Sequence, residues 1–155
     1  MKQTDSGIYI NQVKYARSLV KRFGLEKATH ARTPMAVNAK LTNDPLGESV
    51  NVTLYRSMIG CLLYLTTSCP DIAFSVGVCS RFQSNPKISH LIAIKRIIKY
   101  VSGTCDYGLI YSKESNLSKF KQPPIVLPWK KNVHFRLEFQ HVARVISYSP
   151  IVYTI

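Results

Sequence analysis

The stretch from residue 54 to residue 103 most constrains the fold, because its apolar residues recur at helical spacing in three successive runs. The three stripes consist of Leu54, Met58, Cys61, Leu62 and Leu65, then Ile72, Val76, Cys79 and Phe82, then Leu91, Ile94, Ile98 and Val101. The first run is apolar around most of its surface, which predicts burial on more than one side. Gly60 interrupts that run, and we expect it to permit close approach of another helix.

The breaks between these runs predict short loops. Pro70 suits the first turn of the second helix, and Asp71 is favourable at that helix's positive end. The pair Asn85–Pro86 repeats the cap-and-start signal, and Gly103 ends the third helix. Three helices joined by short loops predict a small antiparallel bundle.

The N-terminal part predicts a short strand followed by a helix. Residues 8–10 alternate as a strand does, Asn11 is the expected N-cap, and Gly24 is the expected stop. The apolar face of this helix consists of Val13, Ala16, Leu19, Val20 and Phe23. The cations on its other side are Lys14, Arg17, Lys21 and Arg22.

These patterns together predict a mainly α (α+β) fold. Residues 1–26 form the strand–helix unit, 27–52 a linker with Pro and Asn, and 53–104 the helical bundle. Residues 105–116 contain a connection strand, GLIYS, and 117–155 form a β-prone, poorly defined tail. Within that tail Val133 to Phe139 alternate as a strand would, without an evident partner.

Composition adds a strong positive charge to this fold. Lys and Arg total 21 against 8 Asp and Glu, for a net charge of +13. Such a charge favours polyanions, of which nucleic acid is the commonest, with anionic membrane surfaces as the alternative. No stretch reaches the roughly 18 apolar residues of a membrane span, and no signal-peptide pattern occurs. We therefore expect an intracellular protein, cytoplasmic or nuclear, with no membrane partner.

Cysteine and histidine spacing gives no sign of a metal site. The cysteines stand at positions 61, 69, 79 and 105, and the histidines at 30, 90, 134 and 141. Neither set contains a C-x-x-C or H-x-x-x-H pair, so we expect no metal and no cofactor. Cys61 and Cys79 are interpreted as small core residues, and His90 as a packing or capping residue.

Six segments follow one another in a characteristic order: GIYINQVKYARSLVKRFG, TPM, YRSMIGCLLYLT, PDIAFSVGVCSRF, NPKISHLIAIKRIIKYVSGT and GLIYS. This ordered set, from about residue 7 to residue 112, resembles the Pol polyprotein of copia-type LTR retrotransposons. The resemblance implies the end of a reverse transcriptase palm, the thumb that grips the template–primer duplex, and the connection to RNase H. By position, the residues that match the motif are Tyr55, Arg56, Gly60, Pro70, Asp71, His90, Arg96, Tyr100 and Gly103.

The chain departs from that family at chemically important places. The polymerase motif Tyr-x-Asp-Asp, whose aspartates hold two metal ions, is absent. Cys69 stands where the family usually has Arg, and LSKFKQPPIVLPW follows GLIYS where an RNase H strand is expected. We therefore expect a truncated or decayed fragment of an RNA-directed DNA polymerase that is not itself an enzyme.

Three functions remain compatible with these residues. The first is sequence-independent binding of RNA–DNA or DNA duplexes through phosphate contacts. Its candidate residues are Lys14, Arg17, Lys21, Arg22, Lys87, Lys95, Arg96 and Lys99. The second is a helical interaction module that docks on a palm domain supplied by another chain. The third is a relic with no selected function.

Overall fold

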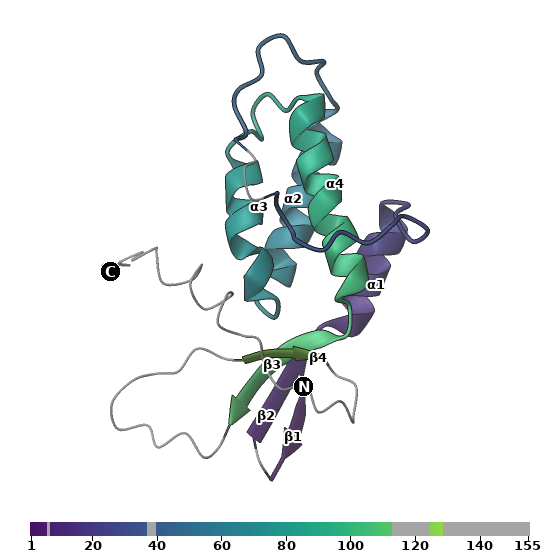
Figure 1. Ribbon diagram of the computed structural model, residues 1–155, viewed down its shortest axis with the longest axis vertical. Coiled ribbons are helices and arrows are strands. Elements are labelled where there is room, and N and C mark those ends of the chain that lie inside the picture. The colour runs from purple at the N-terminus through teal and green to yellow at the C-terminus, as the bar shows by residue number, and fades with distance from the viewer. Residues whose placement is uncertain (6, 37–39, 113–124, 129–155) are drawn as a thin grey trace, which may run out of the picture.

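The computed structural model describes residues 1–5, 7–36, 40–112 and 125–128, and within them helices stand above a small antiparallel sheet (Figure 1). The helices are α1 (Val13–Arg22), α2 (Val52–Leu65), α3 (Ala73–Ser80) and α4 (Ile88–Gly103), with a 3-10 turn, η1 (Pro70–Ile72), before α3. The strands are β1 (Lys2–Thr4), β2 (Gly7–Asn11), β3 (Tyr107–Ser112) and β4 (Ile125–Pro128). The predicted mainly α fold is confirmed, whereas the expected strand at 133–139 lies outside the described residues.

The bundle is built from helices that run alternately up and down (Figure 1). α3 packs against both α2 and α4, so the three predicted helices form the expected antiparallel bundle. Their apolar stripes face inward and bury large side chains completely. The bundle's fully buried apolar residues include Tyr55, Ile59, Leu62, Leu65, Val76, Ile94, Ile97 and Ile98.

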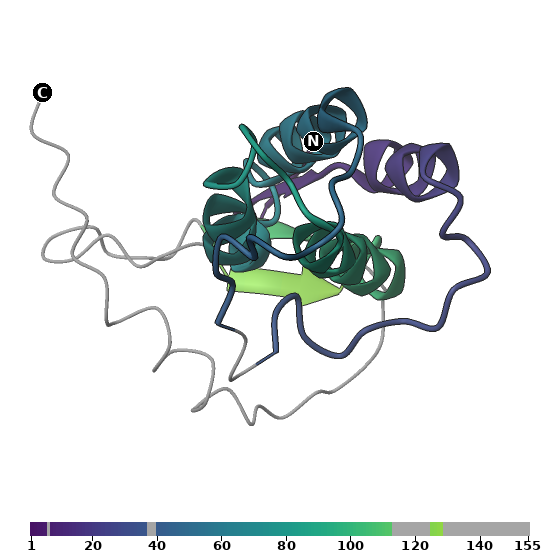
Figure 2. The ribbon, with the colours of Figure 1, turned by 90° about the horizontal axis from the view of Figure 1, so that it is seen from above.

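α1 joins the same core, although it is distant from the bundle in sequence. Its Ala16, Leu19 and Val20 are buried in one cluster with the residues of α2, α3 and α4. α1 packs mainly on α4 and also touches α2. Seen from above, α1 and α3 lie on opposite sides, with α2 and α4 between them (Figure 2).

The sheet ties the beginning of α1 to the end of α4. Its strand order is β1-β2-β3-β4, with every pair antiparallel. β2 leads into α1 and β3 follows α4, and the two strands pair from Gly7↔Ser112 to Asn11↔Gly108. A Cβ at Gly108 would lie 2.5 Å from the carbonyl oxygen of Ile10, so glycine is required by this close approach.

The helix ends differ from two of the predictions. Asn11 is not the N-cap of α1, because its backbone pairs with Gly108 in the sheet and Gln12 takes the cap position. α4 begins at Ile88 rather than directly after Asn85–Pro86. Backbone hydrogen bonds from Val50 N to the Pro86 carbonyl and from Ile88 N to the Glu48 carbonyl hold this segment outside the helix.

Other breaks lie where the sequence predicts them. α1 ends at Arg22 with Phe23 as its C-cap, and Gly24 follows with a φ of +66°, the left-handed conformation expected of a glycine stop. Pro70 starts η1, and Gly103 is the last residue of α4.

Gly60 does not permit close helix packing, so that prediction is wrong. It is exposed on α2, and a Cβ built there meets no atom of the described residues within 4 Å. The buried face of α2 is formed instead by Tyr55, Met58, Ile59, Leu62 and Leu65.

The segment between α1 and α2 runs along α4. Ala31 N donates to the Lys99 carbonyl at 3.4 Å, and farther along the Thr42 carbonyl lies 2.7 Å from His90 Nε2. In the part of the chain that the structure describes, this segment contains no helix and only one isolated bridge, Ser49↔Lys87. It therefore covers one face of α4 and carries its own side chains onto that face.

No helix among the described residues is both long and apolar enough to cross a bilayer.

Candidate nucleic-acid interface

α1 carries a row of exposed cations opposite its buried face. Lys14, Arg17 and Lys21 are exposed, and the helix contains no acidic residue. Their spacing places them on one side because a helix turns once every 3.6 residues. The predicted cations of α1 are therefore accessible to a polyanion.

Two arginines of α1 already have partners. Arg17 forms an ion pair with Asp106 at 2.8 Å, and both side chains are more than a third exposed. Exposed pairs of this kind contribute little to stability and are weakened by salt, so Arg17 can exchange its partner. Arg22 donates to Ser57 Oγ at 3.1 Å, and this hydrogen bond links α1 to α2. The Arg22 guanidinium also lies over the ring of Phe23.

α4 contributes two accessible lysines and one arginine with a structural role. Lys95 is exposed and Lys99 is half-buried. Arg96 donates from Nε to the Thr33 carbonyl at 3.2 Å and from a terminal nitrogen to Thr33 Oγ1 at 2.9 Å. Arg96 therefore fastens the α1–α2 segment onto α4.

Lys87 does not lie with the other predicted cations. Its side chain is 8% exposed, and its Nζ donates to Ser49 Oγ at 2.9 Å. The sequence grouped it with Lys95, Arg96 and Lys99 as a candidate cation for phosphate contact, but it is the N-cap of α4 and is covered by the segment around Ser49. In this arrangement its ammonium group is not available to a phosphate.

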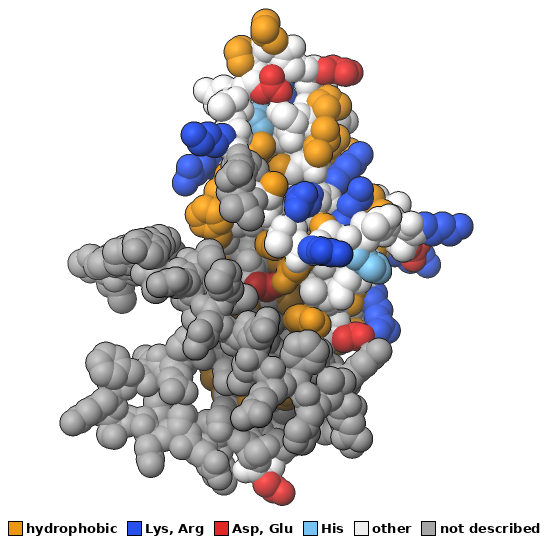
Figure 3. All heavy atoms as spheres, in the orientation of Figure 1, with side chains coloured by type: hydrophobic (Ala, Val, Ile, Leu, Met, Phe, Trp, Pro, Cys, Tyr) orange, Lys and Arg blue, Asp and Glu red, His pale blue; other side chains and the backbone are white. Residues whose placement is uncertain are grey.

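Sequence reasoning missed two cations that the structure adds. Lys27 and Arg32 are exposed, and they belong to the segment that runs along α4. Lys and Arg side chains gather over α1, α4 and this segment (Figure 3). We call this surface the basic face and define it as Lys14, Arg17, Lys21, Lys27, Arg32, Lys95 and Lys99.

The family-motif positions mostly hold the bundle together. The buried Tyr55 hydroxyl donates to the Cys79 carbonyl at 2.8 Å, and Arg56 Nε donates to the Gln83 carbonyl at 3.1 Å. Both contacts join α2 to the end of α3. Burial raises the pKa of Tyr55 well above its usual value, with a further contribution from nearby Cys79.

Asp71 and Tyr100 form a second link, between η1 and α4. The Tyr100 hydroxyl donates to Asp71 Oδ2 at 2.7 Å. Burial, followed by this hydrogen bond and the Asp71 charge, raises the pKa of Tyr100 strongly. Asp71 Oδ1 is buried without a hydrogen-bond partner among the described residues. Asp71 stands two positions after Cys69 in the sequence. The copia-type family that this chain resembles usually has Arg at the position of Cys69.

His90 caps α4, as its sequence position predicted. Its Nδ1 accepts from the Lys87 N–H at 3.0 Å, and its ring stacks on Phe82 with centroids 4.0 Å apart. Among the described residues, no group of three or more His, Cys, Asp or Glu could hold a metal ion. The contacts of these motif residues are therefore structural. What the surface offers to a ligand is its exposed positive charge.

The structure thus defines a basic helical module with a small sheet at one end, and known relatives show its origin. The Pol polyprotein of transposon RE1 from Arabidopsis thaliana is 34% identical over 117 residues, which is 76% of this chain and 8% of that protein. The Pol polyprotein of transposon TNT 1-94 from Nicotiana tabacum is 36% identical over 66% of this chain. An uncharacterized mitochondrial protein of Arabidopsis thaliana is 30% identical over 76% of this chain and 49% of its own length.

This chain belongs to the retrovirus-related Pol polyproteins of copia-type transposons. It spans about 8% of the length of the transposon polyproteins that it matches. No protein-family model matches the chain, and no solved structure matches it.

Proposed function

We propose that this chain is the thumb and connection region of a retrotransposon reverse transcriptase, and that it binds RNA–DNA or DNA duplexes without reading their sequence. The observation that carries the proposal is the basic face. Only one of its seven cations, Arg17, is in an ion pair within the described part of the chain. Lys and Arg side chains that neutralise phosphates release counterions and give affinity for any sequence.

A nucleic-acid partner is favoured over an anionic membrane by two observations. The basic face is assembled from three separate segments of a folded surface rather than from one flexible tail. The relatives are Pol polyproteins of transposons, and the ordered segments of this chain resemble a thumb region that grips a template–primer duplex. A lipid surface would require only charge and apolar anchors.

The chain itself, in this proposal, catalyses no polymerisation. Phosphoryl transfer of this kind requires paired carboxylates that hold metal ions. The acidic residues of this chain stand singly along the sequence, without a D-x-D or E-x-x-E pair. Extension of a primer by the purified chain with Mg²⁺ and nucleotides would overturn this part of the proposal.

The test of binding is a salt titration with a fluorescent RNA–DNA hybrid. The full chain should bind more tightly than an equally basic unfolded peptide, and log affinity should fall linearly with log salt. The double substitution Lys95→Ala with Lys99→Ala should reduce the slope by about 2, close to one unit for each lost phosphate contact.

The control is the single substitution Arg81→Ala, because Arg81 is exposed and is the C-cap of α3, and α3 lies on the opposite side of the bundle from α1 (Figure 2). This substitution should leave the slope within about half a unit of the wild-type value. An equal loss of slope for each removed cation in the two variants would mean that the charge acts generically rather than through the basic face.

A second function, docking on another domain, is favoured by the outer face of α2 and α3. Leu63 is 47% exposed and Phe74 is 72% exposed. In the part of the chain that the structure describes, no atom lies within 4 Å of a Cβ added at Gly60 or Gly77 on the same two helices. We propose that a reverse transcriptase palm domain would cover this face. Light scattering of the chain mixed with a separately expressed palm domain tests the idea, and Phe74→Glu should abolish complex formation.

A further inference from the structure

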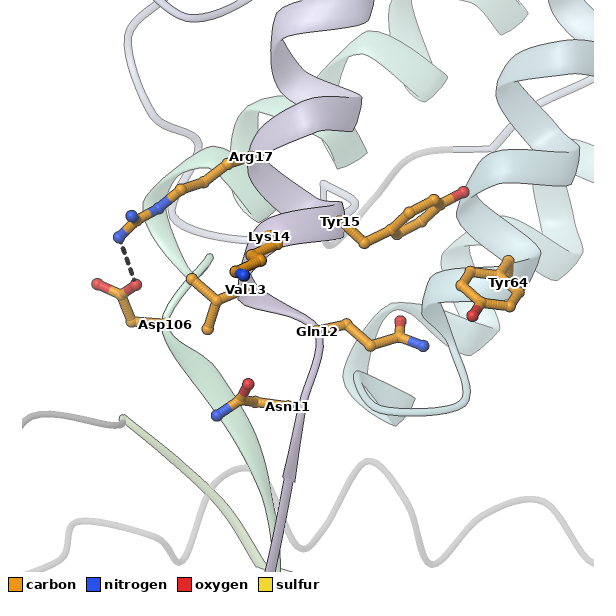
Figure 4. Close-up of a pocket in the computed structure, with 8 residues that line it drawn as sticks. All are labelled: Asn11, Gln12, Val13, Lys14, Tyr15, Arg17, Tyr64 and Asp106. Atoms are coloured by element: carbon orange, nitrogen blue, oxygen red, sulfur yellow. Dashed lines mark hydrogen bonds and ion pairs between the residues drawn. The ribbon is translucent and has the colours of Figure 1, made fainter. Parts of the chain in front are cut away.

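A hollow lies where β2 passes into α1, beside the end of α2 (Figure 4). Its lining includes Gln12 and Lys14 from the start of α1, Tyr64 from α2, and Asp106 from the turn after α4. It also includes Arg17, which, like Lys14, belongs to the basic face. A strand bound along the basic face of α1 would therefore lead directly into the hollow.

One wall of the hollow is an aromatic ring held in position. Tyr64 is 57% exposed, and its ring meets the ring of Tyr15 edge to face, with centroids 4.8 Å apart. Tyr15 is held in turn by its hydroxyl, which donates to the Cys61 carbonyl at 3.1 Å. The ring is thus supported at one side and open at another. An exposed, supported tyrosine ring is a stacking surface for a nucleic-acid base.

A second wall presents a hydrogen-bond acceptor that lacks a donor. Gln12 Nε2 lies 3.4 Å from Thr67 Oγ1, and the Thr67 hydroxyl is already donated to the Tyr64 carbonyl at 2.9 Å. Thr67 must therefore accept from the amide nitrogen, which fixes the orientation of the Gln12 amide. Its Oε1 is buried and has no partner in the described part of the chain.

The aromatic ring, the unpaired acceptor and the cations of the hollow together favour a nucleotide over a simple phosphate ion. A fully ionised phosphate would satisfy the cations, but it has no N–H or O–H group for Gln12 Oε1. A nucleotide offers all three elements, which are a flat ring for Tyr64, a donor on its base or sugar, and a phosphate for the cations. A buried acceptor that gains a donor on binding also favours the ligand that supplies it.

We infer that the hollow binds one unpaired nucleotide at the end of a bound strand. The base stacks on Tyr64, a donor of the base or sugar meets Gln12 Oε1, and the phosphate lies at Lys14. Arg17 reaches the same phosphate by exchanging its solvent-exposed partner, Asp106. This inference rests on the proposed function, because the strand reaches the hollow along the basic face.

The experiment compares two probes, a blunt RNA–DNA hybrid and the same hybrid with a short unpaired extension. The wild-type chain should bind the extended probe at least about 5-fold more tightly, since stacking of one base on an aromatic ring contributes that much or more. Tyr64→Ala should remove this preference and leave affinity for the blunt hybrid unchanged. Tyr64→Phe, which keeps the ring, should retain the preference.

The matched control is Tyr111→Ala, which removes a tyrosine that is 47% exposed on β3 and does not line the hollow. This variant should behave as the wild type does, and thermal melting of each variant should show that it is folded. An equal preference for the extended probe in the wild type and in Tyr64→Ala would overturn the inference.

Failure of the proposed function would look different. Affinity for the blunt hybrid would then equal that of the unfolded basic peptide. A short single-stranded oligonucleotide would still report on the hollow, because its binding would depend on Tyr64 whether or not duplex binding occurs.

Discussion

His90 shows how one side chain can fix the start of a helix and anchor a distant segment. Its Nδ1 accepts the Lys87 N–H, which requires the proton to be on Nε2, and Nε2 then donates to the Thr42 carbonyl at 2.7 Å. The ring is fully buried against Phe82. Both ring nitrogens of His90 are therefore occupied by structural hydrogen bonds, and neither is left for acid–base chemistry.

The substitution His90→Ala should therefore lower the free energy of unfolding by about 2–4 kcal/mol. It leaves a buried N–H and a carbonyl without partners and opens a cavity beside Phe82. Urea unfolding measures the change. The control His30→Ala, at an exposed position, should stay within about 0.5 kcal/mol of the wild type. Equal stability of the two variants would contradict the capping role.

At the scale of helices and strands, periodicity predicted the elements well and their first residues less well. The stripes located α2, η1 with α3, and α4, and the alternation at residues 8–10 located β2. The caps at Asn11 and Asn85–Pro86 were misplaced, because backbone pairing with β3 and with residues 48–50 holds these residues outside the helices. Such pairings join residues far apart in sequence, and local propensity does not reveal them.

Two glycines should respond in opposite directions to the same substitution. Gly60→Ala should raise the free energy of unfolding by about 0.5–1 kcal/mol, because the site is helical and exposed, and no atom of residues 1–5, 7–36, 40–112 or 125–128 lies within 4 Å of the added Cβ. Gly24→Ala should lower it by about 1 kcal/mol, because an added side chain disfavours the φ of +66°.

Thermal and urea unfolding of both variants measure the difference. Destabilisation by Gly60→Ala would mean that another protein surface lies close to α2 in solution and clashes with the added methyl group.

At the scale of the whole molecule, the sequence predicted that the protein has a positively charged surface, but it did not predict which residues form the basic face. Lys27 and Arg32 were missed because nothing local predicts that a segment without helix or strand runs along α4. Lys87 was misplaced for the same reason, since Ser49 belongs to that segment and contacts its side chain. The hollow at Tyr64 was also beyond prediction, because β2, α1, α2 and the turn after α4 meet only in the fold.

The shared core of α1 and the bundle predicts a single cooperative unit. Leu19 is 2% exposed in the same cluster as Ile97 and Ile98. Leu19→Ala should lower the free energy of unfolding by about 2–5 kcal/mol, while unfolding remains one transition with an unchanged urea dependence. Circular dichroism during urea unfolding measures both quantities. A variant in which α1 melts separately and most helical signal persists would contradict the shared core.

Buried thiols and hydroxyls give the whole molecule a predictable response to alkaline pH. Burial raises the pKa of Cys69 and of Cys79 to about 11, from the usual 9.0. Burial also raises the pKa of Tyr55 and of Tyr100 above the usual 10.0. All four groups therefore keep their protons in the folded state at a pH where the unfolded chain loses them.

Folding stability should consequently be constant up to about pH 9 and fall progressively as the pH rises through about 11, because the unfolded state then binds fewer protons than the folded state. Urea unfolding under reducing conditions at several pH values measures the decline. Tyr100→Phe removes one of the groups, so its stability should fall less steeply above about pH 10 than that of the wild type. A free energy of unfolding that stays level from about pH 8 to pH 11 would mean that these side chains are accessible to water in solution.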